Sequence, residues 1–246
     1  MGLEYQHFLI PKDNSFRPSE QQVESLLAEW LKHGYLDRSC PAKYEVKKHH
    51  SPDFKMLKEE NGTLPAKVKN MLDRKELLLR WEITFDENEI LHYPLNSLPD
   101  HHPKETYYDL VLHFSDDFLY QCSEVINPFE STQCKCGVEL EYYPEPEIDM
   151  FNSARIRRKC ECGEMFKPQD HITLVRSGFG IGEGDQIKLA GGCTYRFAIV
   201  IDCQKCLPFT RSPHKKRDAF IRATRNFVSI CENALDMELT DISDFY

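Results

Sequence analysis

Long hydrophobic runs are missing from this 246-residue sequence. No window approaches the ~18 consecutive apolar residues that a membrane-spanning helix needs, and no N-terminal stretch combines a basic head, an apolar run and a small-residue cleavage site. These absences predict a cytoplasmic protein that neither spans a membrane nor is secreted. Low-complexity tracts are absent too, and hydrophobic residues make up 41% of the chain, which is ample for a packed core.

Basic residues are outnumbered by acidic ones. Lysine and arginine together number 31 against 40 aspartates and glutamates, so the formal net charge is −9. A chain with this balance repels polyanions on average, which disfavours broad contact with nucleic acid or with an anionic membrane surface. Catalytic signatures are missing as well, because no segment resembles a Ser-His-Asp order or a nucleophile elbow. The sequence therefore favours a non-enzymatic protein, although catalytic residues need not be contiguous.

Cysteine, in contrast, is plentiful, with ten residues in the chain. In a short secreted chain ten cysteines would predict disulfides, but without a signal peptide they indicate metal binding or reduced thiols. Four of them form two matched motifs, CKCG at residues 134–137 and CECG at residues 160–163, with 23 residues between Cys136 and Cys160. The repeat predicts that both motifs serve one metal ion.

The chemistry of zinc explains this pattern. Zn²⁺ prefers four ligands in a tetrahedron, and cysteine thiolates supply both the charge and the geometry. Each motif can deliver two cysteines from one turn, and the glycine that follows them permits a tight backbone path. The residues between the motifs are enough for an outgoing strand, VELEYY, and a returning strand, ARIRRK. We therefore predict a hairpin pinned by metal, a ribbon, over residues 131–170.

The two motifs resemble the knuckles of zinc-ribbon (rubredoxin-like) proteins, which usually read Cys-x-x-Cys-Gly. The resemblance covers about residues 131–170, and this chain departs from the family pattern by having one residue between the cysteines of each pair. It implies four ligands, Cys134, Cys136, Cys160 and Cys162. Since four thiolates close the coordination sphere, it also implies a structural Zn²⁺ with no open position for an activating water. The alternative is four thiols that bind no metal.

A second cysteine pair follows a predicted strand. Cys203 and Cys206 have the spacing of a thioredoxin-type redox turn. In that turn the second cysteine lies inside the next helix and gains from the helix dipole, whereas here the next predicted helix begins only near Ser212. A second metal site with Cys193 or His214 is another interpretation. Plain structural thiols are the interpretation that the sequence favours.

Two basic clusters are candidate binding surfaces. One lies at the start of the predicted C-terminal helix and comprises Arg211, Lys215, Lys216 and Arg217. Cations beside a helix N-terminus are typical of an anion site, and the alternative is a solvated helix face. The other cluster lies on the returning ribbon strand and comprises Arg155, Arg157 and Arg158. Such residues can contact phosphates, but glutamates in the outgoing strand and its turn oppose them, so nucleic acid ranks below protein as a partner.

The rest of the pattern predicts an α+β fold with a mostly antiparallel sheet and helices near both ends. Strands are predicted at residues 4–10, 44–46, 76–85, 89–95, 107–115, 171–177 and 193–202. Helices are predicted from Ser19, over residues 65–74 and from Ser212. The glycine-rich segment 178–184 is not followed by a helix pattern, which favours a turn between strands over a phosphate-binding loop.

We therefore predict that residues 1–130 and 171–246 together make one α+β domain, into which residues 131–170 are inserted as a four-cysteine zinc ribbon. The predicted function is that of an interaction protein that binds another protein and makes no membrane contact. Two alternatives stay open. One is an enzyme that uses a thiol or an anion site between Cys203 and Arg217, and the other is a nucleic-acid-binding protein that uses the basic ribbon strand.

Overall fold

The structure is a computed structural model that describes residues 5–36, 42–47, 57–59, 76–84, 94–95, 107–120, 134, 136–138, 158–166, 172–177, 185–190, 194–202 and 222–245. Its helices are α1 (Glu20–Lys32) and α3 (Arg225–Leu235). Its strands are β1 (Tyr5–Pro11), β2 (Ala42–Lys47), β3 (Leu57–Glu59), β4 (Glu76–Thr84), β5 (Tyr107–Tyr120), β6 (Arg158–Lys159), β7 (Met165–Phe166), β8 (Ile172–Ser177), β9 (Asp185–Ala190), β10 (Thr194–Asp202) and β11 (Leu239–Phe245).

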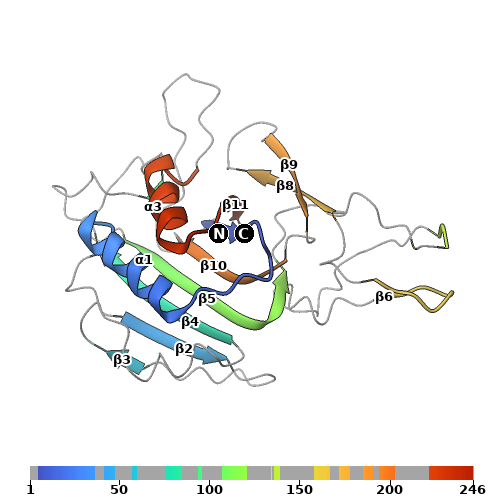
Figure 1. Ribbon diagram of the computed structural model, residues 1–246, viewed down its shortest axis with the longest axis horizontal. Coiled ribbons are helices and arrows are strands. Elements are labelled where there is room, and N and C mark those ends of the chain that lie inside the picture. Colours follow the sequence, from blue (N-terminus) through green and yellow to red (C-terminus); the bar gives the residue numbers. More distant parts are fainter. Residues whose placement is uncertain are drawn as a thin grey trace.

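Seven of the strands form one sheet in the order β11-β1-β10-β5-β4-β2-β3. Every neighbouring pair in it is antiparallel, and the two helices lie side by side along it (Figure 1). The predicted α+β class with a mostly antiparallel sheet is therefore confirmed. Two separate hairpins, β6-β7 and β8-β9, complete the described strands.

The side chains of strand β5 alternate between the two faces of the sheet. Leu110 and Leu112 belong to the hydrophobic core beneath the helices, whereas Asp109 and His113, at alternate positions, lie on the opposite face and are also buried.

β10 lies between β1 and β5 and is buried at all but one of its positions. This confirms the prediction that residues 193–202, with their nearly continuous apolar run, form a central strand covered on both faces.

Helix α1 begins and ends where its sequence predicts. The hydroxyl of Ser19 accepts a hydrogen bond from the backbone N–H of Gln22, and the Gln22 side chain accepts one from the backbone N–H of Ser19, which is a complete capping box. The helix stops at Lys32, and Gly34 has a φ of +73°, a conformation that suits glycine. Its buried face consists of Val23, Leu26, Leu27 and Trp30.

Helix α3 begins later than predicted. The predicted start near Ser212 is wrong for this helix, because Thr224 is its N-cap and its first helical residue is Arg225. The backbone N–H of Ala223 donates to Oδ2 of Asp241 at 2.7 Å. The backbone N–H of Thr224 donates to a carbonyl oxygen of the neighbouring segment 94–95 at 2.6 Å. These bonds hold the preceding residues in extended backbone, so the helix cannot continue upstream through them.

The two helices meet over the sheet through aromatic side chains. The Trp30 ring of α1 stacks on Phe227 of α3, with centroids 5.8 Å apart and an interplanar angle of 19°. The same indole meets Trp81 of β4 edge-on at 6.1 Å and 87°. Its Nε1–H points to Sγ of Cys231 at 3.4 Å, so the one polar atom of the buried ring has a partner. Trp30 is therefore the side chain that joins both helices to the sheet.

The remaining predicted elements have mixed outcomes. β8 and β9 pair antiparallel with Ser177 opposite Asp185, which confirms that the glycine-rich segment connects two strands. The predicted helix 65–74 lies outside the described residues, as does most of the predicted strand 89–95, of which Leu95 forms an isolated bridge with Ala223. Neither described helix has the length and apolarity required to cross a membrane.

Candidate metal centre

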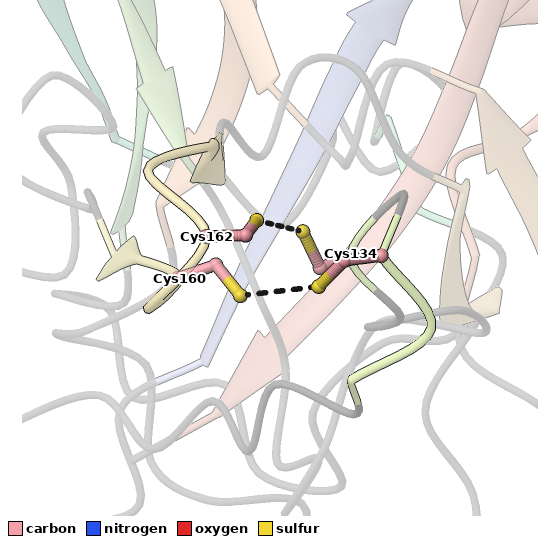
Figure 2. A group of neighbouring side chains, drawn as sticks. Cys134, Cys160 and Cys162 are labelled. Atoms are coloured by element: carbon pink, nitrogen blue, oxygen red, sulfur yellow. Dashed lines mark hydrogen bonds between the residues drawn. The ribbon is translucent and has the colours of Figure 1, made fainter.

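The structure brings the four motif cysteines together. The sulfur atoms of Cys134, Cys136, Cys160 and Cys162 all lie within 4.8 Å of one another. Two contacts join different motifs, at 3.3 Å between Cys134 and Cys162 and at 3.5 Å between Cys136 and Cys160 (Figure 2). With Zn–S bonds of about 2.3 Å, a tetrahedral site needs sulfurs about 3.8 Å apart. The observed cluster has the size of such a site.

Both knuckles have the same backbone. In the first, the N–H of Cys134 donates to the carbonyl of Val138, and that of Gly137 donates to the carbonyl of Cys134, both at 2.8 Å. The second knuckle repeats both bonds at the same distances, from residue 160 to residue 164 and from residue 163 to residue 160. The two cysteine pairs, although 26 residues apart in their first positions, therefore offer the metal two equivalent turns.

Glycine ends each knuckle for a conformational reason. Gly137 has a φ of +86° and Gly163 a φ of +97°, a region that residues with a Cβ rarely adopt. A Cβ built on either one would meet no atom within 4 Å, so steric space is not the constraint. The positive φ turns the chain after the glycine, so that the carbonyl of Val138, and likewise that of Glu164, can accept the amide of the first cysteine of its knuckle.

The four thiols influence one another's ionisation. Without a metal, the backbone amide of Val138 and the neighbouring thiols lower the pKa of Cys136 to about 7. In Cys134 the amide of Cys136 lowers the pKa, but burial and the adjacent thiols outweigh it and raise the value to about 12. The pKa of Cys160 is raised as well. With their raised pKa values, Cys134 and Cys160 hold protons at neutral pH that a divalent cation would displace on binding, so metal affinity should increase with pH.

The cluster has a covered side and an open side. Cys134 and Cys160, the first cysteine of each knuckle, are only 8% and 3% exposed. Cys136 and Cys162, the second cysteine of each, are exposed to solvent. The β6-β7 hairpin that carries the second knuckle lies at one end of the long axis, away from both helices (Figure 1). The open side thus faces solvent far from the aromatic core.

Among the described residues, this is the single group of three or more potential ligand side chains close enough to hold one ion. Four thiolates fill a tetrahedral shell, so a metal held here has no vacant position for substrate or water. The arrangement is compatible with a structural metal site.

The other predicted site residues lie outside the described part of the chain. This holds for Cys203 and Cys206, and for the cation cluster of Arg211, Lys215, Lys216 and Arg217. It also holds for Arg155 and Arg157, whereas the backbone of Arg158 begins β6. Because α3 begins at Arg225, the described helix does not place the predicted cation cluster at its N-terminus.

Sequence reasoning missed a charged cluster on the sheet face opposite the helices. Nη1 of Arg80 on β4 lies 2.5 Å from Oδ2 of Asp109 on β5 and 3.3 Å from Oδ2 of Asp202 on β10. Asp109 is 3% exposed and Asp202 is 4% exposed, and the two are directly opposite in the sheet register. The available signal was one aspartate in each of two apolar strand segments, YYDLVLHF and FAIVID.

Comparisons with known proteins give no relative for this chain: no protein-family model matches it, and neither does any curated protein or solved structure. The function proposed below therefore depends on the residues of the chain alone.

Proposed function

We propose that residues 131–170 form a zinc ribbon in which Cys134, Cys136, Cys160 and Cys162 bind one structural Zn²⁺. The observation that supports this is the convergence of four sulfurs from two equivalent knuckles within 4.8 Å. Soft thiolates in a tetrahedron select zinc or iron and disfavour magnesium or calcium, which prefer oxygen. Zinc, which has no redox chemistry, is the ion suited to a purely structural role.

The function we propose for the ribbon is to present a binding surface for another protein, while residues 1–130 and 171–246 form the α+β domain that carries it. Val138 is 52% exposed and Met165 is 42% exposed, and they are the large hydrophobic side chains exposed among the described residues. Both lie next to the cysteine knuckles. Methionine is among the residues enriched at protein-binding surfaces. A metal with a closed shell would fix the shape of that surface.

The zinc assignment is tested by native mass spectrometry and metal analysis of the full chain. We expect one zinc per chain in the wild type and none in Cys160→Ser, since the variant loses a thiolate from the shell. The matched control is Cys231→Ala, which removes a cysteine buried in the helix core and should retain the metal. Iron in place of zinc would change the ion assigned to the site. A second zinc retained in Cys160→Ser would assign Cys203 and Cys206 to a second metal site. No metal in any sample would contradict the proposal.

The binding surface is tested by the double variant Val138→Lys with Met165→Lys. It should keep its zinc, because neither side chain is a ligand, and should lose affinity for a captured partner protein by at least about tenfold, equivalent to ~1.4 kcal/mol. Lys32→Ala, at an exposed position on α1, is the control and should bind as the wild type does. If the double variant binds normally, the ribbon is not the surface. Binding to nucleic acid that weakens steeply with salt would instead support the alternative use of the basic ribbon strand.

A further inference from the structure

The two close sulfur pairs share one pattern. Each pair joins a buried cysteine of one knuckle to an exposed cysteine of the other, Cys134 to Cys162 and Cys160 to Cys136 (Figure 2). A disulfide needs its sulfurs about 2.05 Å apart, and the two pairs are at 3.3 and 3.5 Å. Each exposed thiol therefore has a buried thiol from the other knuckle next to it, close enough to form a bond after a small movement.

We propose that this centre is also an oxidation site, at which a hydroperoxide such as hydrogen peroxide converts the metal-bound cysteines into two disulfides and expels the zinc. The inference rests on the proposed zinc ribbon. Cys136 and Cys162 are the positions that react first, because they are the exposed cysteines of the cluster and a peroxide must reach the sulfur to oxidise it. Cys160 and Cys134 are the respective resolving cysteines.

The chemistry balances with peroxide as the only oxidant. The thiolate sulfur of Cys136 attacks one peroxide oxygen, the O–O bond breaks, and a sulfenic acid and a hydroxide ion result. The thiolate of Cys160 then attacks the Cys136 sulfur, the S–S bond forms, and the S–O bond breaks to release a second hydroxide. A second peroxide does the same at Cys162 and Cys134. In total four thiolates lose four electrons, two peroxides become four hydroxide ions, and Zn²⁺ leaves because its anionic ligands are gone.

The oxidised ribbon would remain closed. Both disulfides join one knuckle to the other, so covalent bonds replace the metal in holding the two turns together. This differs from the effect of a chelator, which removes zinc and leaves nothing in its place. The surface around Val138 and Met165 would thus exist in a zinc form and a disulfide form, with oxidation converting the first into the second and reduction by a thiol, followed by zinc binding, restoring it.

Cys231 provides an internal control for this chemistry. Its side chain is fully buried in the core, and burial raises its pKa to about 12 although the Trp30 N–H opposes the shift. A thiol in this state is neither accessible nor ionised, so it should stay reduced under peroxide that oxidises the knuckles.

The test uses the zinc-loaded full chain, treated with hydrogen peroxide while released zinc is followed with a chromophoric chelator. We expect one zinc released for every two peroxides consumed, a thiol still present at Cys231, and recovery of zinc binding after reduction. Connectivity is read by peptide mass spectrometry. Trypsin cleaves after Lys135 and a glutamate-specific protease after Glu161, which separates the two cysteines of each knuckle.

The outcomes separate this inference from the proposed function. Cys136–Cys160 and Cys134–Cys162 disulfides would support it, and so would equal release from a Cys203→Ser, Cys206→Ser double variant. Zinc that stays bound in peroxide, disulfides within single knuckles, or sulfinic acids without disulfides would overturn the oxidation site and leave the structural zinc intact. A chain without zinc before peroxide would contradict the zinc ribbon itself, and this inference with it.

Discussion

Replacing Arg80 by methionine is expected to lower the free energy of unfolding by about 3 kcal/mol. The guanidinium contacts Asp109 and Asp202, which are 3% and 4% exposed. Methionine fills a similar volume but leaves both carboxylates in the sheet without this cation. Loss of one partner from a buried ion cluster typically costs about 3–5 kcal/mol, and the lower value applies here because the Arg80 side chain is itself 25% exposed and so partly screened by water.

The measurement is urea unfolding of the wild type, Arg80→Met and a triple variant that adds Asp109→Leu and Asp202→Leu. The triple variant should recover most of the lost stability, since hydrophobic replacement of a whole buried ion cluster is often neutral or stabilising. Such a recovery would assign the cost to the two carboxylates that remain in the single variant. A loss below about 1 kcal/mol in Arg80→Met would mean that the cluster behaves like an exposed salt bridge.

This charged cluster also shows which part of the fold the sequence could not predict. Asp109 and Asp202 are 93 positions apart, and they meet because β5 and β10 pair in one particular antiparallel register. Register is set by the packing of all the strands and by their connections, not by the residues of one strand. A strand with a strong local pattern could be predicted, since the run of aromatic and branched residues from 76 to 85 corresponds to β4 (Glu76–Thr84).

The two helices also differ in how far their first residues could be predicted from neighbouring sequence. The start of α1 could be predicted because its capping box lies within four consecutive residues. The start of α3 was missed although Thr224 is a local N-cap whose hydroxyl accepts from the Phe227 amide. The distant bond from the Ala223 amide to Asp241 of β11 could not be seen in the sequence. β11 itself was not predicted. It pairs with β1, more than 200 positions earlier in the chain, and its sequence LTDISDF carries few of the apolar residues that mark a central strand.

The four-cysteine cluster could be predicted, because each knuckle is a short local motif and the spacing of the two motifs is visible in the sequence. What could not be foreseen is the exposure of the cysteines. One cysteine of each pair is buried and the other exposed, and the contacts at 3.3 and 3.5 Å each join one knuckle to the other. These features depend on how the two turns face each other, which the motif alone does not specify.

Replacing Trp30 by alanine should lower the free energy of unfolding by about 3–5 kcal/mol, the usual range when a large buried aromatic side chain is removed from a core. Trp30 is fully buried between Phe227 and Trp81. Alanine would leave a cavity between both helices and the sheet. Trp30→Phe is the matched control, because it keeps an aromatic ring while losing the N–H that points to Cys231, and its cost should be about half as large or less.

Tryptophan fluorescence is the appropriate probe, since Trp30 and Trp81 are the two tryptophans of the chain and both lie in the core. In Trp30→Ala the fluorescence comes from Trp81 of β4 alone. The urea midpoint of this signal therefore reports unfolding of the sheet against which the substituted side chain packs. An alanine variant as stable as the phenylalanine variant would show that the helices do not depend on this side chain to pack. Because neither tryptophan belongs to a knuckle, fluorescence follows the core while zinc content follows the ribbon. The two measurements together therefore tell loss of the core from loss of the metal.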